Sequence, residues 1–178
     1  MALPFFTIGH STRTFAEFVE MLTNNGVQIV VDVRTVPRSR TNPQYNRDVL
    51  AKNLSDIQIK YEHITSLGGL RKSKGDIPKE TNAFWQNASF HNYADYAMSD
   101  SFRDGLQMLR NLGHTAPCVI MCAEAVWWRC HRRIITDYLI MAGETVFHIL
   151  GPNRIEGAHM TEGAKPVANG ILIYPAVE

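Results

Sequence analysis

The chain has 178 residues, of which 45% are hydrophobic and 20% charged, and its formal net charge is +1 at pH 7. This length and composition predict one globular domain over residues 1–178, and the near-neutral charge excludes a broadly basic, histone-like protein. No apolar run approaches the roughly 20 residues of a membrane span. The N-terminus also lacks the features of a signal peptide, and three cysteines fit a reducing compartment, so we expect a cytoplasmic protein with no membrane partner.

The first third of the chain alternates strand and helix patterns. Residues 5–9 form an apolar run that is typical of a buried strand. Thr14 followed by Glu17 is a capping-box pattern, so a helix is expected to begin there and to end near residues 24–26. A β-branched strand, a helix and a third strand are expected next, over residues 28–34, 46–57 and 60–64.

Residues 65–92 show no clear periodicity. A connection of this length inside a compact domain is usually functional, so we interpret the segment as a candidate lid whose aromatic second half packs on the core. Helices are expected after it over residues 101–112 and about 129–142, each followed by a glycine. Strands are expected over residues 118–122 and 145–150, with a small edge strand over 170–174.

This alternation predicts the α/β class: a single-domain, three-layer Rossmann-like fold with a mostly parallel sheet. The carboxyl ends of parallel strands meet at one edge, where open α/β sheets place their sites. Polar residues that follow the expected strands should therefore gather at that edge. They are His10, Arg13, Asp32, Arg34, His63, Cys122 and Glu124.

The stretch from residue 117 to 143 carries the densest chemistry. Cys122 ends a strand and precedes a helix close to Arg129, a setting that lowers a thiol pKa and favours the thiolate. The loop resembles the anion-binding cysteine loops of rhodaneses and cysteine phosphatases, which end in an arginine. The alternative interpretation of Cys122 is a small core residue.

Other roles for the same residues stay open. Cys122 and Cys130, with nearby or distant histidines, could supply soft metal ligands or a redox pair. The chain has no paired zinc spacing, and adjacent residues on a helix point about 100° apart, so no metal site is assigned. Asp32 with Arg34 could equally be a structural ion pair.

The arginines are grouped although the chain has almost no net charge, which indicates a local anion site. Arginine clusters bind phosphate, and Trp127 or Trp128 could stack on a base. No Walker loop or GxGxxG fingerprint is present, so no motif identifies a cofactor. The expected catalytic residues are Cys122, Glu124, His10 and His63, and the expected anion- or substrate-binding residues are Ser11, Arg13, Asp32, Arg34, Ser39, Arg40, Arg129, Cys130, His131, Arg132 and His159.

Five elements of the sequence carry a family resemblance when they are taken in order. They are Thr7–Arg13, Val31–Arg40, Tyr61–Gly69, Cys122–Arg132 and Ala158–Ala164. Together they resemble the family called domain of unknown function 488 over almost the full chain. The resemblance implies a cytoplasmic, mostly prokaryotic α/β domain without an agreed reaction, and its pattern falls on the same strand ends.

The leading hypothesis is an enzyme that acts on a phosphate-bearing partner, either a small molecule such as a nucleotide or a nucleic acid. Such an enzyme would be a hydrolase or a transferase with rhodanese- or phosphatase-like thiol chemistry. The alternatives are a non-catalytic nucleotide or nucleic-acid binding module, and a metal or redox site at Cys122 and Cys130.

Overall fold

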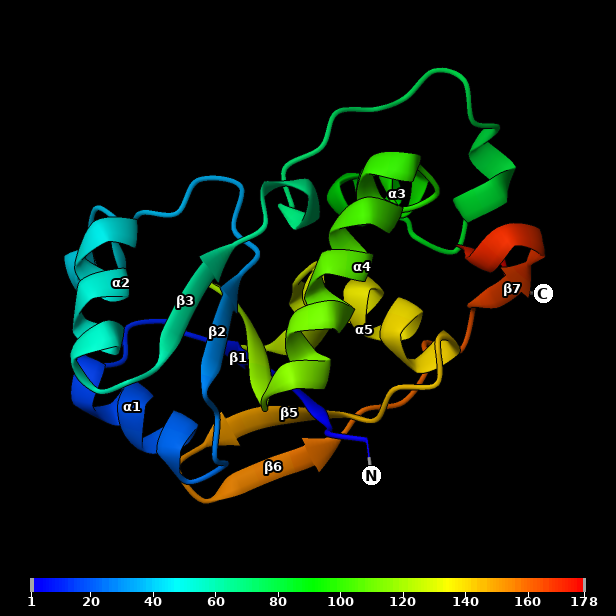
Figure 1. Cartoon of the computed structure of the whole chain (residues 1–178). Helices are drawn as coiled ribbons and strands as arrows, with labels where there is room; N and C mark the ends of the chain where they lie inside the picture. The colour runs from blue at the N-terminus through cyan, green and yellow to red at the C-terminus, as the bar shows by residue number, and fades with distance from the viewer. Residues whose placement is uncertain (1, 178) are drawn as a thin grey trace.

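The structure, a computed structural model, describes residues 2–177 and is built around a six-stranded sheet (Figure 1). The strands lie in the order β3-β2-β4-β1-β5-β6; the first five are parallel to one another, and β6 is antiparallel to β5. The predicted α/β class with a mostly parallel, Rossmann-like sheet is confirmed. The strands are β1 (Phe5–Gly9), β2 (Ile29–Asp32), β3 (Lys60–His63), β4 (Cys118–Cys122), β5 (Val146–Gly151) and β6 (Arg154–Gly157).

Helices cover both faces of this sheet, which gives three layers (Figure 1). On β1, alternate side chains enter two separate cores: Phe6 and Ile8 pack with α1 and α2, whereas Phe5 packs with α3, α4 and α5. In the part of the chain that the structure describes, no helix is both long and apolar enough to cross a membrane. The helices are α1 (Phe15–Thr23), α2 (Arg47–Asp56), α3 (Ala88–Tyr96), α4 (Asp100–Thr115) and α5 (Arg132–Met141).

The two central strands send the chain to opposite faces of the sheet. β1 leads to α1 in one layer, and its neighbour β4 leads to α5 in the other. The ends of these strands lie side by side, because Gly9 is in register with Cys122. A crevice between the outgoing loops is expected at such a switch point, and ligands of open α/β sheets bind there.

Two helices differ from their predicted bounds. α4 continues through Gly113 to Thr115 instead of ending before the glycine. A Cβ at position 113 would lie 2.3 Å from the Phe5 ring, so a glycine is needed there. This glycine lets the helix pack closely on β1. α5 begins at Arg132, since Trp127–Arg129 forms a separate 3-10 turn that closes at Cys130.

The other differences lie outside the central strands. Residues 65–92 include two 3-10 turns and the start of α3, a helix that the sequence pattern did not predict and that Asn87 caps with its side chain. The expected edge strand near residues 170–174 is β8 (Ile171–Ile173). It pairs with β7 (Lys165–Val167) in a separate two-stranded sheet, so the edges of the main sheet are formed by β3 and β6.

Candidate functional site

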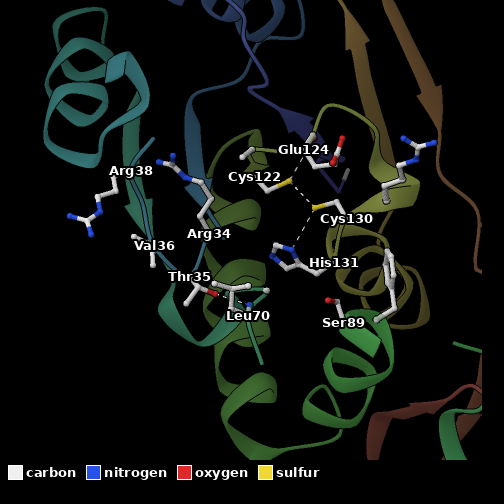
Figure 2. A pocket seen from close by; sticks show the side chains of 14 residues that line it. Arg34, Thr35, Val36, Arg38, Leu70, Ser89, Cys122, Glu124, Cys130 and His131 are labelled. Carbon is white, nitrogen blue, oxygen red and sulfur yellow. Dashed lines mark hydrogen bonds between the residues drawn. The ribbon is translucent and has the colours of Figure 1, made fainter. Parts of the chain in front are cut away.

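A cavity of about 350 Å³ lies at the carboxyl ends of the central strands. Its walls come from the loops after β2 and β4, from the start of α3 and from both ends of the 65–92 segment. The lining residues are Arg34, Thr35, Val36, Arg38, Gly69, Leu70, Ser89, Phe90, Cys122, Ala123, Glu124, Arg129, Cys130 and His131 (Figure 2).

Two cysteine sulfurs face one another at this cavity (Figure 2). Cys122 is the last residue of β4, and Cys130 lies eight residues later, just before α5. Their Sγ atoms are 2.7 Å apart, both side chains are buried, and both are free thiols. The sequence places Cys122 at the strand end, but the path of the loop determines its contact with Cys130.

The guanidinium of Arg132 lies behind the sulfur pair. Arg132 is 1% exposed, and its Nε donates to Cys122 Sγ at 3.0 Å while its Nη2 donates to the Glu124 carbonyl oxygen at 2.7 Å. No carboxylate oxygen within residues 2–177 comes within 4.0 Å of this guanidinium. A buried cation needs a counter-charge, so the sulfur pair is the group that can supply one.

The two thiols titrate differently because of their surroundings. Burial alone would raise the pKa of Cys130, but the hydrogen bond from Cys122 and the nearby His131 and Arg132 hold it well below its ordinary value. Burial and the neighbouring Cys130 raise the pKa of Cys122 well above its ordinary value. The arrangement therefore favours a Cys130 thiolate that accepts a hydrogen bond from the Cys122 thiol.

Arg132 also connects the sulfurs to a buried histidine on β5. Its Nη1 donates to Thr7 Oγ1 at 3.0 Å, and the Thr7 hydroxyl lies 2.7 Å from Nδ1 of His148. Burial and the charge of Arg132 lower the pKa of His148 to about 3, so this imidazole is neutral at physiological pH. We call Cys122, Cys130, Arg132, Thr7 and His148 the sulfur cluster.

His131 borders both the cavity and Cys130. Its Nε2 lies 2.7 Å from the Val33 carbonyl oxygen, which requires a proton on Nε2, and its Nδ1 lies 3.5 Å from Cys130 Sγ. A Cβ at Gly69 would lie 2.5 Å from Nδ1 of this ring. Glycine at position 69 thus allows the backbone to close over the imidazole, and Nδ1 remains available to exchange a proton with the thiol.

The loop after β4 is held against the end of β1. The N–H groups of His10 and Ser11 donate to the carbonyl oxygens of Cys122 and Ala123. A Cβ at Gly9 would lie 1.8 Å from the Glu124 carbonyl oxygen, so only glycine permits this approach. The Glu124 carboxylate is exposed at the cavity, where it accepts a hydrogen bond of 3.4 Å from the Val126 N–H.

A second buried arginine lies beyond the end of β2. Arg34 donates to the Asp32 carboxylate through Nε at 3.0 Å and Nη2 at 2.8 Å, and Tyr61 donates its hydroxyl to the same carboxylate. His10 completes the group, with Nε2 3.4 Å from Arg34 Nη1. We call Asp32, Arg34, Tyr61 and His10 the carboxylate cluster, and its bidentate pair is the structural ion pair that the sequence left open.

A comparison with protein families adds to this geometry. Residues 14–139 match the family described as Domain of unknown function DUF488. The chain belongs to this family. No curated protein and no solved structure matches the chain.

In this DUF488 protein the matched range includes β2, β3, β4 and most of α5. β1, which supplies Thr7 and Gly9 to the site, precedes the range, and β5 with His148 follows it. Among residues 2–177, the site included, no group of three or more His, Cys, Asp or Glu side chains is placed to hold a metal ion.

Two predicted catalytic histidines lie outside the cavity lining of the DUF488 chain. His10 stacks on Tyr45 with ring centroids 4.1 Å apart, and burial lowers its pKa to about 4. His63 Nε2 lies 2.7 Å from the Arg34 carbonyl oxygen. Their hydrogen bonds hold the ends of β1, β2 and β3, whereas His131 is the histidine that reaches the sulfurs.

The cavity brings together six of the predicted site residues: Arg34, Cys122, Glu124, Arg129, Cys130 and His131. Arg132 contacts the sulfurs from behind. Ser39 and Arg40 line a neighbouring hollow of about 430 Å³, Arg13 binds the Gly9 carbonyl oxygen, and His159 is exposed. The residues that sequence reasoning missed are Thr7 and His148 behind the sulfurs and Thr35, Val36, Gly69, Leu70, Ser89 and Phe90 on the walls. A threonine inside an otherwise apolar strand was the available signal for Thr7.

Proposed function

We propose that this protein is a cytoplasmic enzyme that acts on a phosphate-bearing substrate, a nucleotide or nucleic acid, through a cysteine thiolate. The observation that carries the proposal is the sulfur pair at the cavity, with Sγ atoms 2.7 Å apart and Arg132 as the buried cation beside them. A thiolate stabilised by a nearby cation is the reactive form of cysteine. Cys130 is therefore the proposed nucleophile, and Cys122 supports it.

The charge around the cavity supports an anionic substrate. Arg38 and Arg129 line the cavity and are exposed, and neither has a carboxylate within 4.0 Å among residues 2–177. The N–H groups of Ala123, Glu124 and Ala125 likewise have no acceptor in the described chain. Free guanidinium and amide donors are the groups that bind phosphate oxygens.

The apolar walls support a substrate with a second, less polar part. Val36 and Leu70 are 48% and 74% exposed at the cavity, and Phe90, in the first turn of α3, also lines it. Large exposed apolar side chains at a concave site favour contact with a ligand surface such as a base or a sugar. The 65–92 segment supplies Leu70 and Phe90, so its predicted role as a lid remains consistent with this substrate class.

The proposed reaction uses Cys130 and His131 as a nucleophile–base pair. His131 Nδ1 holds the proton that the Cys130 thiol has lost, and the thiolate attacks the phosphorus of a phosphate ester. An S–P bond forms as the ester P–O bond breaks, and Nδ1 delivers its proton to the leaving oxygen. Water then gives a proton to Nδ1 as it attacks the phosphorus, which releases phosphate and restores the thiolate; an alcohol in place of water makes the enzyme a transferase.

The test measures phosphate or nucleotide release from a panel of phosphomonoesters, nucleotides and short single-stranded RNA and DNA. We expect Cys130→Ser to lower kcat by about 10³-fold or more, as the loss of a nucleophile does in other enzymes. Cys118→Ser is the matched control, because Cys118 is buried at the far end of β4 and should leave turnover unchanged. Turnover that survives Cys130→Ser, or a panel with no turned-over member, contradicts the proposal.

A second candidate function, binding of nucleic acid without turnover, is favoured by the hollow beside the cavity. Val36 and Arg38 line both spaces, and the hollow adds Arg40, so exposed cationic surface extends beyond one phosphate. A polymer would follow such a surface, and its affinity would fall steeply with salt. Strong, salt-dependent binding that is indifferent to Cys130→Ser would favour this function over the enzyme.

A further inference from the structure

The Cys122–Cys130 pair has the arrangement of a dithiol that can be oxidised. The sulfurs are 2.7 Å apart without being bonded, and the two residues are joined by a loop of seven residues that contains a 3-10 turn. A disulfide needs sulfurs close to 2.05 Å, so a small movement of this loop brings them to bonding distance. Cys118, the third cysteine, is buried at the start of β4 and is not part of the cavity lining.

We infer that Cys122 and Cys130 are a reversible redox centre that a hydroperoxide closes to a disulfide. This inference uses the same sulfurs as the proposed function but requires neither its substrate nor its turnover. Two further observations support it: both sulfurs line a cavity of about 350 Å³, which admits a small peroxide, and Arg132 stabilises a thiolate there.

The peroxide is the only oxidant that the formation of this disulfide requires. The Cys130 thiolate attacks the terminal oxygen of the peroxide, the O–O bond breaks, and the other oxygen leaves as an alcohol, or as water from hydrogen peroxide, after taking a proton. Cys130 is then a sulfenic acid. The Cys122 thiol loses its proton and attacks the Cys130 sulfur, and hydroxide leaves as water. The two thiols have lost two electrons, and the peroxide has gained them.

The surroundings of the pair make the disulfide easy to reduce. In the disulfide neither sulfur is anionic, so Arg132 loses its only candidate counter-charge within the described residues. A cation that stabilises the thiolate stabilises the reduced form, which makes the disulfide the better oxidant. A small dithiol should therefore reopen it, and the site would recover its nucleophile.

The test treats the purified protein with hydrogen peroxide, counts free thiols and maps linked peptides by mass spectrometry. Wild type should lose two of its three thiols and give a peptide pair joined through Cys122 and Cys130, and dithiothreitol should restore both. The matched control Cys118→Ser should form the same link. In Cys122→Ser the oxidised Cys130 has no partner, so dimedone should trap its sulfenic acid.

The outcomes separate this inference from the proposed enzyme. A link that includes Cys118, or oxidation to sulfinic and sulfonic acids without a linked peptide, overturns the redox centre. A Cys122–Cys130 link in a protein that turns over no phosphate ester supports the redox centre and removes the enzyme. Turnover of a phosphate ester by a protein that never forms the Cys122–Cys130 link supports the enzyme and overturns the redox centre.

Discussion

The protein contains two buried arginines whose guanidiniums lie near the ends of the neighbouring strands β2 and β4, and they are neutralised in different ways. Arg34 is 6% exposed and donates two hydrogen bonds to the Asp32 carboxylate, which also accepts one from the Tyr61 hydroxyl. Arg132, 1% exposed, faces the sulfurs of Cys122 and Cys130 instead. The guanidiniums are alike, so the partners determine what each cluster can do.

The partners differ in how readily they change. A carboxylate cannot be oxidised by mild agents, so the ion pair of the carboxylate cluster has a single oxidation state. A thiol can gain or lose a proton, and a pair of thiols can also lose two electrons. The end of β2 thus carries a structural ion pair, in the carboxylate cluster. The end of β4 carries thiols whose protonation and oxidation state can change, in the sulfur cluster.

Removal of the Asp32 charge should give the largest effect on stability. Asp32→Asn leaves Arg34 as an uncompensated buried cation, and breaking a buried pair in this way costs about 3–5 kcal/mol of unfolding free energy. Urea denaturation of the variant and of wild type measures the loss.

The matched control for this prediction is the double variant Asp32→Asn/Arg34→Met. It has no buried cation to leave unpaired, so it should recover a large part of the lost stability. A double variant that is less stable than Asp32→Asn alone would show that the packing of Arg34, including its bond to the Tyr45 carbonyl oxygen, outweighs its charge.

Removal of Arg132 should cost less, because its partner can adapt. In Arg132→Met the thiolate takes up a proton instead of remaining as an unpaired charge, so we expect a loss of about 1.5–3 kcal/mol for the hydrogen bonds to the charged group. The pKa of Cys130 should rise, because the guanidinium that favours its thiolate is gone. Alkylation rates measured against pH in a Cys118→Ser background follow that pKa.

Arg47→Met is the control for the alkylation experiment. Arg47 is exposed at the start of α2, on the opposite face of the sheet from Cys122 and α5, so it should leave the alkylation profile of Cys130 unchanged. If Arg132→Met also leaves that profile unchanged, the guanidinium is not the counter-charge of the thiolate, and the comparison between the two clusters fails.

Because polar residues follow the predicted strands, the sequence predicted that the site lies at the carboxyl edge of the sheet. It did not predict which side chains contact one another there. Parallel strands put residues 10, 34, 63 and 122 near one edge by their spacing alone. Which histidine reaches the sulfur depends on side-chain direction: His131 contacts Cys130, while His10 stacks on Tyr45. The seven-residue loop that returns Cys130 to Cys122 has no period from which its path could be derived.

The helix that was missed has a similar cause. The buried residues of α3 are the four consecutive ones from Tyr93 to Tyr96, so the segment lacks the spaced apolar stripe that identifies an amphipathic helix. Its N-cap, Asn87, was the readable signal. Local capping chemistry would therefore have identified α3 where hydrophobic periodicity did not.

The last prediction compares the histidines of the two clusters as pH falls. His10 belongs to the carboxylate cluster and His148 to the sulfur cluster, and burial lowers their pKa values to about 4 and about 3. Below pH 6.5 the unfolded chain protonates each histidine while the folded protein does not. Stability should therefore fall as pH drops from 6.5 to about 4, by up to about 1.4 kcal/mol per pH unit for each histidine.

Histidine variants separate the contributions of His10 and His148 to the pH dependence of stability from the opposite contribution of Asp137. Burial raises the pKa of Asp137 to about 6, so the folded protein binds a proton there before the unfolded chain does, which stabilises the fold as pH falls over the same range. Asp137 is present in wild type and in both variants, so its contribution cancels when His10→Gln or His148→Gln is compared with wild type.

Each variant should show a shallower fall in stability between pH 6.5 and 4. His148→Gln should keep differing from wild type down to about pH 3, where the sulfur cluster's histidine titrates. Equal slopes in wild type and His148→Gln would mean that His148 is protonated in the folded protein, and the Thr7 hydroxyl could then not donate to its Nδ1.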